Sequence, residues 1–340
     1  NITWKNDVVS EGDASKQVST DPSAAADVYM FASDQLGVLM DAKAIGQLGT
    51  DAEKQVKEQN GDLEVDSVTG TDGKLYGVPY TDNTWFMYYN KSKITEDEAK
   101  DFDTILSKAK VAFSLQNSWY INGFYDGLSL FGEKGNDADA GMVFPKDGAD
   151  ITSYLVDVVA NPNFSNDDGA SGLAAIKDGS ADVLFSGTWS AKDVKEALGD
   201  NYAATSLPTF TVNGQKKQMK SFAATKAAAY NPNAKNPKAA AQFAAYLGST
   251  EAQKLHYEMR AIPPTDKSLS DLTTDDIAAK AQADTMANTA LLQSGLAGMN
   301  DWWTPAETFG KALINKEITK DNAAAKYQDW VDQAKGTIAE

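Results

Sequence analysis

Cysteine is absent from this sequence of 340 residues. Its absence excludes disulfide bonds, thiolate metal sites and cysteine nucleophiles. Long hydrophobic runs are also missing, since no segment approaches the roughly 18 apolar residues of a membrane-spanning helix. No signal peptide precedes Asn1, so we expect either a cytosolic protein or a mature exported one.

Basic residues are scarce relative to acidic ones. The sequence has 31 lysines and arginines against 48 aspartates and glutamates, which gives a formal net charge of −17. A surface of this sign repels phosphate backbones and anionic membranes. We therefore expect no nucleic-acid partner.

Motifs for catalysis and metal binding are missing as well. The single histidine, His256, lies in a polar helical segment without a metal or triad partner near it in the sequence. Glycine-rich phosphate loops and the serine elbow are absent. The acidic loops 133–139 and 163–168 lack the residue order of an EF-hand, so we expect neither a metal ion nor a cofactor. Sequence spacing does not locate the carboxylate pair of a glycosidase, and a carbohydrate-active hydrolase stays open as an alternative.

Apolar residues, by contrast, are plentiful enough for two cores. They make up 42% of the chain, and this length exceeds what one compact core accommodates. Strand-like and helix-like segments alternate, which is typical of α/β proteins. We expect a helix over 151–159, a strand over 182–186, and helix starts at Asn236-Pro237 and at Thr304-Pro305-Ala306-Glu307.

The stretch 72–91, DGKLYGVPYTDNTWFMYYNK, indicates how two such domains are connected. Two extended runs, 75–80 and 85–89, are separated by the four polar residues 81–84. A strand buried in one parallel sheet is nearly all apolar. We interpret the stretch as a strand crossing from one lobe to the other, with an ordinary β-hairpin as the alternative.

The amino-terminal segment is harder to interpret. Residues 1–4 and 6–9 read as two strands, with only Lys5 between them. A parallel crossover needs about 10 to 12 residues. Either a segment is missing there or the strand assignments are wrong.

Aromatic residues give the clearest signal for a binding site. Five of them stand at strand ends or just before helix starts, where α/β sheets carry ligand sites; they are Phe31, Trp85, Trp119, Trp189 and Trp303. For each one alone, core packing is the alternative. Together they favour a site, because flat aromatic faces suit the apolar faces of sugar rings.

Polar residues near these aromatics provide hydrogen-bonding groups for sugar hydroxyls. They are Asp34, Asp82, Asn83, Gln116 and Asn117. A cleft of aromatic and amide groups, with no nucleophile or acid pair in evidence, indicates capture of a ligand rather than its conversion.

Four segments carry a resemblance to a known family. They are DPSAAADVYMFASDQLG (21–37), KLYGVPYTDNTWFMYYNK (74–91), ADVLFSGTWS (181–190) and GMNDWWTPAETF (298–309). In their order and spacing the chain resembles the extracellular solute-binding proteins of carbohydrate ABC importers, most closely the maltose/maltodextrin-binding proteins of Gram-positive bacteria. The resemblance implies a two-lobed periplasmic-binding-protein-like fold of type II, α/β in class, whose hinged lobes close on a ligand in the cleft between them.

The resemblance also implies roles for individual residues. Phe31, Trp119, Trp189 and Trp303 match positions that stack on glucosyl rings, and Asp34 matches a carboxylate that binds sugar hydroxyls. Asn83 and Asn117 stand where the family leads us to expect glutamates, and Glu307 stands where a basic residue is frequent, so the identity of the sugar is open. The complete set of expected ligand-binding residues is Phe31, Asp34, Gln35, Asp82, Asn83, Trp85, Asn117, Trp119, Trp189, Trp303 and Glu307.

Discontinuous lobes follow from the same resemblance. We expect an N-lobe of residues 1–82 plus 227–271, a C-lobe of 86–222 plus 280–340, and hinge segments at about 82–85, 223–226 and 272–279.

The expected function is the capture of oligosaccharides, foremost maltodextrins, outside the cell. The expected partners are the membrane subunits of an ABC transporter, to which a monomeric, non-enzymatic receptor delivers the sugar. The full-length precursor would be lipid-anchored at the cell surface. A carbohydrate-active hydrolase and a polysaccharide-binding surface adhesin are the alternatives.

Overall fold

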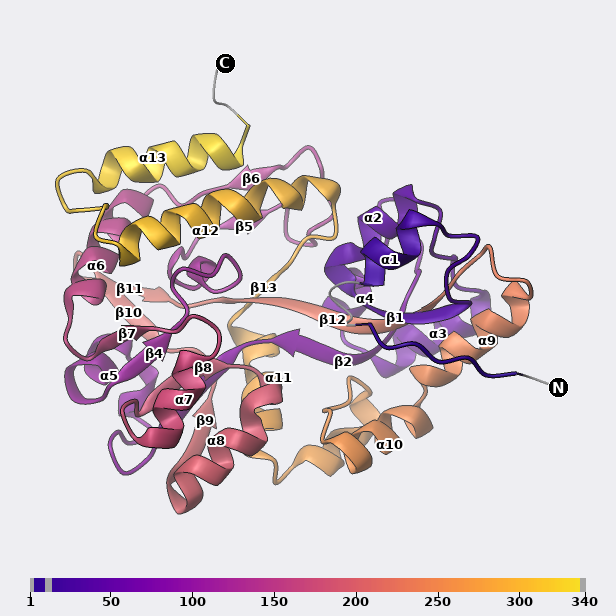
Figure 1. Ribbon diagram of the computed structural model, residues 1–340, viewed down its shortest axis with the longest axis horizontal. Coiled ribbons are helices and arrows are strands. Elements are labelled where there is room, and N and C mark those ends of the chain that lie inside the picture. The colour runs from indigo at the N-terminus through magenta and orange to yellow at the C-terminus, as the bar shows by residue number, and fades with distance from the viewer. Residues whose placement is uncertain (1–2, 10–13, 337–340) are drawn as a thin grey trace.

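Strand β12 (Ser221–Tyr230) runs from one lobe of the molecule into the other in the computed structural model (Figure 1), which describes residues 3–9 and 14–336. Its sequence SFAATKAAAY is dominated by small side chains, and eight of its ten residues are buried. Small side chains let other elements approach a strand closely on both of its faces, which suits a strand that both lobes share.

The neighbours of β12 change along its length. Its first residues pair in parallel with β13 (Ala290–Leu292), and its last residues pair antiparallel with β1 (Val28–Ala32). Strand β2 (Val78–Thr84) pairs antiparallel along the other edge, where Ala223 lies opposite Thr84. This four-stranded sheet forms the base of the N-lobe and the connection to the C-lobe.

Strand β3 (Phe86–Asn90) follows β2 after the single residue Trp85 and belongs to a different sheet. It pairs with β8 (Val183–Ser186) and β9 (Tyr202–Thr205) but not with β2. The crossing strand predicted for the stretch 72–91 is therefore confirmed, and the hairpin alternative is wrong.

The C-lobe is built on a five-stranded sheet in the order β7-β4-β8-β3-β9, completed by β4 (Val111–Phe113) and β7 (Phe164–Asn166). Successive side chains of a strand point to opposite faces. Met87 and Tyr89 accordingly join a core that includes residues of α6, α12 and α13, whereas Phe86 and Tyr88 join a second core with residues of α7, α8 and α11. Helices thus cover both faces of this sheet (Figure 1).

The helices divide between the lobes (Figure 1). Those of the N-lobe are α1 (Ala14–Thr20), α2 (Leu36–Asp41), α3 (Thr50–Gln59), α4 (Asp62–Ser67), α9 (Pro237–Leu247) and α10 (Thr250–Arg260). Those of the C-lobe are α5 (Phe102–Lys108), α6 (Gly148–Ala160), α7 (Ser171–Asp178), α8 (Ala191–Leu198), α11 (Ile277–Asn288), α12 (Asn300–Ile314) and α13 (Ala323–Ala334). Two short hairpins, β5 (Ser129–Leu130) with β6 (Met142–Val143) and β10 (Thr209–Val212) with β11 (Gln215–Gln218), complete the C-lobe.

The N-lobe core draws on two distant parts of the chain. It contains buried residues between Ala14 and Val78 together with Ala227 and Ala229 of β12. The proposed hinge 272–279 includes the first turn of α11, where Ala278 already packs in the C-lobe. The exact hinge residues stay a proposal.

Two expectations about local structure are wrong. Residues 3–9 form no strand, and Trp4 instead packs on Phe243 of α9 with 4.9 Å between the ring centroids; residues 1–2 lie outside the described part of the chain. Helix α12 begins at Asn300 rather than after Thr304, so that Pro305 lies inside it.

Candidate functional site

The segment that follows β13 makes contact with both lobes. The backbone N–H of Gln293 donates to the carbonyl of Ala223 on β12, with 2.8 Å between N and O, and the N–H of Gly37 on α2 donates to the carbonyl of Gly295 at 2.9 Å. Residues 293–295 therefore lie where the N-lobe, the C-lobe and the connecting sheet meet, which is called the junction below.

Asp34 reaches this junction from the N-lobe. It lies in a 3₁₀ turn, Ser33–Gln35, that links β1 to α2, and Ser33 Oγ anchors the turn by accepting the N–H of Thr225 on β12 at 3.0 Å. Burial raises the pKa of Asp34 to about 6, against the opposing effect of hydrogen bonds from its own backbone and from the Gln293 side chain. A carboxyl group in this setting changes charge close to neutral pH.

Trp119 reaches the same junction from the C-lobe. Its indole Nε1–H donates to Gln293 Oε1 with 2.7 Å between the two atoms. Two buried indoles hold its loop, because Trp302 Nε1 donates to the Ser118 carbonyl at 2.9 Å and Trp85 Nε1 donates to the Trp119 carbonyl at 3.0 Å. The loop thus presents Trp119 from a fixed backbone.

Trp189 stands beside Trp119, with 6.0 Å between the ring centroids. It follows β8, and 53% of its surface is exposed. Its ring lies so close to Gly187 that a Cβ there would be 2.1 Å from the indole, so only glycine permits this ring position. A large exposed indole held in this way, next to a partly buried one, forms a surface suited to stacking on a ring.

The remaining C-lobe candidates lie on α12 and in the loop after β4. Trp303 is partly buried and packs edge-on against Phe222, with 6.0 Å between centroids. Glu307 lies one turn further along α12 and forms an ion pair with Lys311 at 2.5 Å. Asn117 Oδ1 accepts the N–H of Trp119 at 2.8 Å, which shapes the loop.

Asp82 and Asn83 lie on β2, where the two sheets connect. The Asp82 carboxyl lies beside that of Glu64 on α4, and burial together with the Glu64 charge raises the pKa of Asp82 well above its ordinary value. Its Oδ1 atom is buried without a hydrogen-bond partner in the described part of the chain, and contact of Asp82 with a ligand stays a prediction. Asn83, the next residue, points to the opposite face of the sheet.

Two other residues expected to contact a ligand are enclosed by the protein. Phe31 and Trp85 are both 0% exposed. The ring of Phe31 packs in the N-lobe core beside Gly77, and that of Trp85 stacks on Tyr120 with 5.0 Å between centroids. Gln35 is used inside the N-lobe, where its Oε1 accepts the N–H of Ser15 at 3.0 Å. Phe31 and Trp85 therefore lie behind the site rather than at its surface, whereas ligand contact by Gln35 stays a prediction.

Sequence reasoning missed Gln293 and Glu64. Neither is aromatic and neither belongs to a motif, and both gain their positions through contacts with residues far away in the chain. A polar residue directly after a strand was the only available signal for Gln293.

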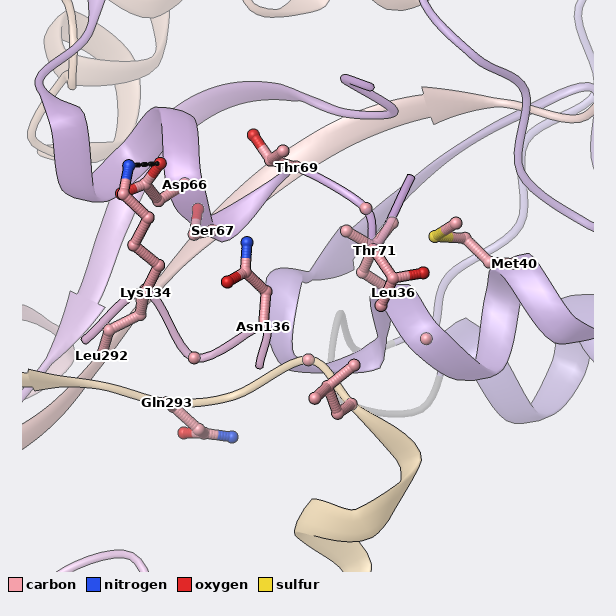
Figure 2. Close-up of a pocket in the computed structure, with 15 residues that line it drawn as sticks. Leu36, Met40, Asp66, Ser67, Thr69, Thr71, Lys134, Asn136, Leu292 and Gln293 are labelled. Carbon is pink, nitrogen blue, oxygen red and sulfur yellow. Dashed lines mark hydrogen bonds and ion pairs between the residues drawn. The ribbon is translucent and has the colours of Figure 1, made fainter. Parts of the chain in front are cut away.

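A groove lies beside the segment that contains Gln293, on the side away from the Gln293 side chain (Figure 2). Its cavity volume is about 30 Å³, and its walls include Met40 and Thr69 of the N-lobe and Asn136 of the C-lobe. Lys134 Nζ pairs across it with Asp66 Oδ1 at 3.0 Å. Figure 2 shows the side chain of Gln293 pointing away from the groove.

Within residues 3–9 and 14–336, no three histidines, aspartates or glutamates are placed to hold a metal ion. His256 packs edge-on against Tyr80 with 5.4 Å between centroids, and burial lowers its pKa.

None of the helices in the described part of the chain has the length and apolar character needed to cross a membrane.

Comparison with known proteins identifies the family to which this chain belongs. The sequence model of a family described as bacterial extracellular solute-binding protein matches residues 3–288. A maltooligosaccharide ABC transporter solute-binding lipoprotein of Streptococcus pneumoniae is 27% identical, over 86% of this chain and 74% of its own length. A galactooligosaccharide-binding protein of Bacillus subtilis is also 27% identical, over 92% of this chain and 77% of its own.

Solved structures agree with this match. A protein solved with acarbose is 43% identical, with a TM-score of 0.93 over 100% of this chain and 91% of that one. A maltodextrin-binding protein from L. casei BL23, solved without ligand, is 27% identical, with a TM-score of 0.87 over 96% of this chain and 88% of that one. The mixed α/β, two-lobed fold of type II predicted from the sequence is confirmed.

Proposed function

Because the chain belongs to the bacterial extracellular solute-binding proteins, we propose that it binds maltooligosaccharides outside the cell and delivers them to an ABC transporter. The single observation that carries the proposal is that Gln293 links Asp34 of the N-lobe to Trp119 of the C-lobe, which stands beside Trp189. A carboxylate accepts from sugar hydroxyls and indole faces cover the apolar faces of the ring. The two lobes thus supply complementary halves of a sugar site.

The relatives support maltooligosaccharides as the ligand class. The similar proteins include a maltooligosaccharide transporter lipoprotein, a maltodextrin-binding protein and a protein solved with acarbose. The Bacillus subtilis relative that binds galactooligosaccharides makes a second sugar class worth testing. A panel of α- and β-linked oligosaccharides tests the choice, with maltotetraose expected to bind most tightly.

The proposed site combines the residues that the structure leaves available. Asp34 approaches the sugar from the N-lobe, and Trp119, Trp189 and Trp303 approach it from the C-lobe. Asn83, Asn117 and Glu307 stay in the proposed set as hydrogen-bonding groups at its edge. Gln35 and Asp82 also stay in the proposed set, and Phe31 and Trp85 support the site from behind.

Delivery to a transporter requires that the loaded receptor differ from the empty one. We propose that the lobes close about the connecting strands, near residues 82–85, 223–226 and 272–279. Contacts from both lobes to one sugar favour the closed state by their differential affinity for it. Small-angle scattering is expected to show a smaller radius of gyration when maltotetraose is added. A surface adhesin that needs no hinge would show no compaction.

Binding without turnover separates this proposal from a hydrolase. Calorimetry with maltotetraose is expected to show saturable binding, and chromatography of the same mixture is expected to show intact sugar. Release of shorter sugars at a catalytic rate would contradict the receptor function. The Streptococcus pneumoniae relative is a lipoprotein, which supports a lipid-anchored, cell-surface precursor for this chain too.

A further inference from the structure

We propose that Gln293 is a positioning residue that fixes the ring of Trp119 and the carboxylate of Asp34 relative to each other across the boundary between the lobes. The inference rests on the proposed function, since it assigns a role in sugar binding to a residue that contacts two members of the proposed site. It needs no contact between Gln293 and the sugar itself.

Hydrogen-bond chemistry fixes the orientation of the Gln293 amide. An indole N–H can only donate, so the amide end that lies 2.7 Å from Trp119 Nε1 is the oxygen. The other end therefore carries the two N–H groups, which can only donate. These N–H groups lie close enough to the Asp34 carboxyl to lower its pKa against the effect of burial. One amide thus joins a donor of the C-lobe to an acceptor of the N-lobe.

The backbone around Gln293 is held firmly enough to transmit this orientation. Its own N–H donates to Ala223 of β12, and the next residue, Ser294, donates through Oγ to the carbonyl of Gly135 at 2.5 Å. Only 5% of Gln293 is exposed. Because its side chain points away from the groove of Figure 2, the amide faces the side on which Trp119 and Asp34 lie.

Two consequences follow for the proposed sugar site. The N–H of Trp119 is already used by the protein, so this residue offers a ligand its ring face rather than its polar edge. The Gln293 amide supplies Asp34 with a neutral donor. This donor offsets part of the free-energy cost of burying the carboxylate charge and holds the carboxylate in one rotamer. Both effects reduce the entropy cost of ordering the Trp119 and Asp34 side chains when a sugar binds.

Two substitutions separate the two hydrogen bonds. Gln293→Met has nearly the same length and removes both of them. Gln293→Glu keeps an oxygen for the Trp119 indole but removes the donor to Asp34 and places a second carboxyl group beside it. Gln282→Met is the matched control, because Gln282 is a buried glutamine on α11 of the C-lobe, 2% exposed and outside the proposed site.

The test combines calorimetry with maltotetraose and the ¹⁵N–¹H spectrum of the indole groups. Gln293→Met is expected to weaken binding at least fivefold and to shift the Trp119 indole proton upfield, while the Trp302 indole, bonded to Ser118, stays in place. Gln293→Glu is expected to keep the Trp119 signal and still lose affinity. Gln282→Met is expected to change neither.

Wild-type affinity in Gln293→Met, or an unmoved Trp119 indole signal in that variant, would overturn the positioning role. Failure of the wild-type protein to bind any maltooligosaccharide would instead overturn the proposed function. The indole spectrum would even then report whether Gln293 holds Trp119, so the two failures are distinguishable.

Discussion

Trp119 and Trp189 stand with 6.0 Å between their ring centroids and 38° between their planes. One comes from the loop after β4 and the other from the turn after β8, which are neighbouring strands of the C-lobe sheet. Two indoles at this angle present two tilted faces rather than one flat surface. A curved chain of linked sugar rings fits two such faces better than a single ring does.

Trp189→Ala is expected to weaken maltotetraose binding by about tenfold or more, because aromatic stacking contributes about 1 kcal/mol beyond area burial. The fold is expected to survive, since more than half of the side chain is exposed. Trp4→Ala is the matched control, because Trp4 is 60% exposed and packs on α9 of the N-lobe. A large drop in melting temperature with normal binding by the folded variant would assign Trp189 to the core.

Asp34→Asn is expected to stabilise the protein at pH 7 and to weaken sugar binding. The pKa of Asp34 is about 6 in the folded state against 3.8 as the ordinary value, so the folded state binds this proton more tightly. The carboxyl therefore favours folding below pH 3.8, and this contribution is lost as pH rises through 6, at a cost of up to about 3 kcal/mol.

The measurement for Asp34→Asn is urea unfolding between pH 4 and pH 8, with calorimetry at pH 7. The gain in the free energy of unfolding is expected to shrink as pH falls toward 4. Asp41→Asn, at the exposed end of α2, controls for the loss of one charge. Equal stability of Asp34→Asn and wild type at every pH would show that Asp34 is not held as a costly buried charge.

Asp82→Asn is expected to raise stability increasingly as pH rises. Burial and the Glu64 carboxyl raise the pKa of Asp82 well above its ordinary value, so its contribution to stability is present in acid and is lost toward high pH. An amide carries no charge to bury or repel. Glu64→Gln, which removes the other carboxyl, is expected to act in the same direction. Melting temperatures measured from pH 5 to pH 8 check both variants, and a uniform loss of stability would contradict the carboxyl pairing.

Glu307→Ala is expected to change the free energy of unfolding by less than about 0.5 kcal/mol, because exposed ion pairs four residues apart on a helix contribute little. The sequence predicted a helix start at Thr304-Pro305-Ala306-Glu307, but α12 begins at Asn300 and Glu307 pairs with Lys311. Lys311→Ala is the matched control for the ion pair. Lost sugar binding in Glu307→Ala alone, with stability unchanged, would place its carboxylate in the sugar site.

Local signals in the sequence predicted local structure well. The apolar spacing over 151–159 marks α6, and Asn236 caps α9 by accepting the N–H of Ala239 at 3.3 Å. The predicted start of α12 was wrong because Trp302 is buried, at 0% exposed, and its packing extends the helix past Pro305 toward the N-terminus. Tertiary packing there outweighs the hydrogen bond that proline lacks.

The candidate site was harder to predict because its geometry depends on pairing between distant segments. An aromatic residue at a strand end faces either the core or the cleft, and strand register decides which. Phe31 and Trp85 face the core, whereas Trp189 faces outward. Gln293 lies 174 positions from Trp119 in the chain, so no local pattern could join them.

Strand β12 also determines the order in which the molecule can be completed during synthesis. The ribosome delivers the N-lobe segments first, but β1 and β2 both pair with β12 and not with each other. Until Tyr230 has emerged from the ribosome, β1 and β2 lack β12, the strand that pairs with both of them. The strands of the C-lobe sheet, β3, β4, β7, β8 and β9, are already complete by Thr205. The strands that are made first, β1 and β2, are therefore the last to obtain a finished sheet.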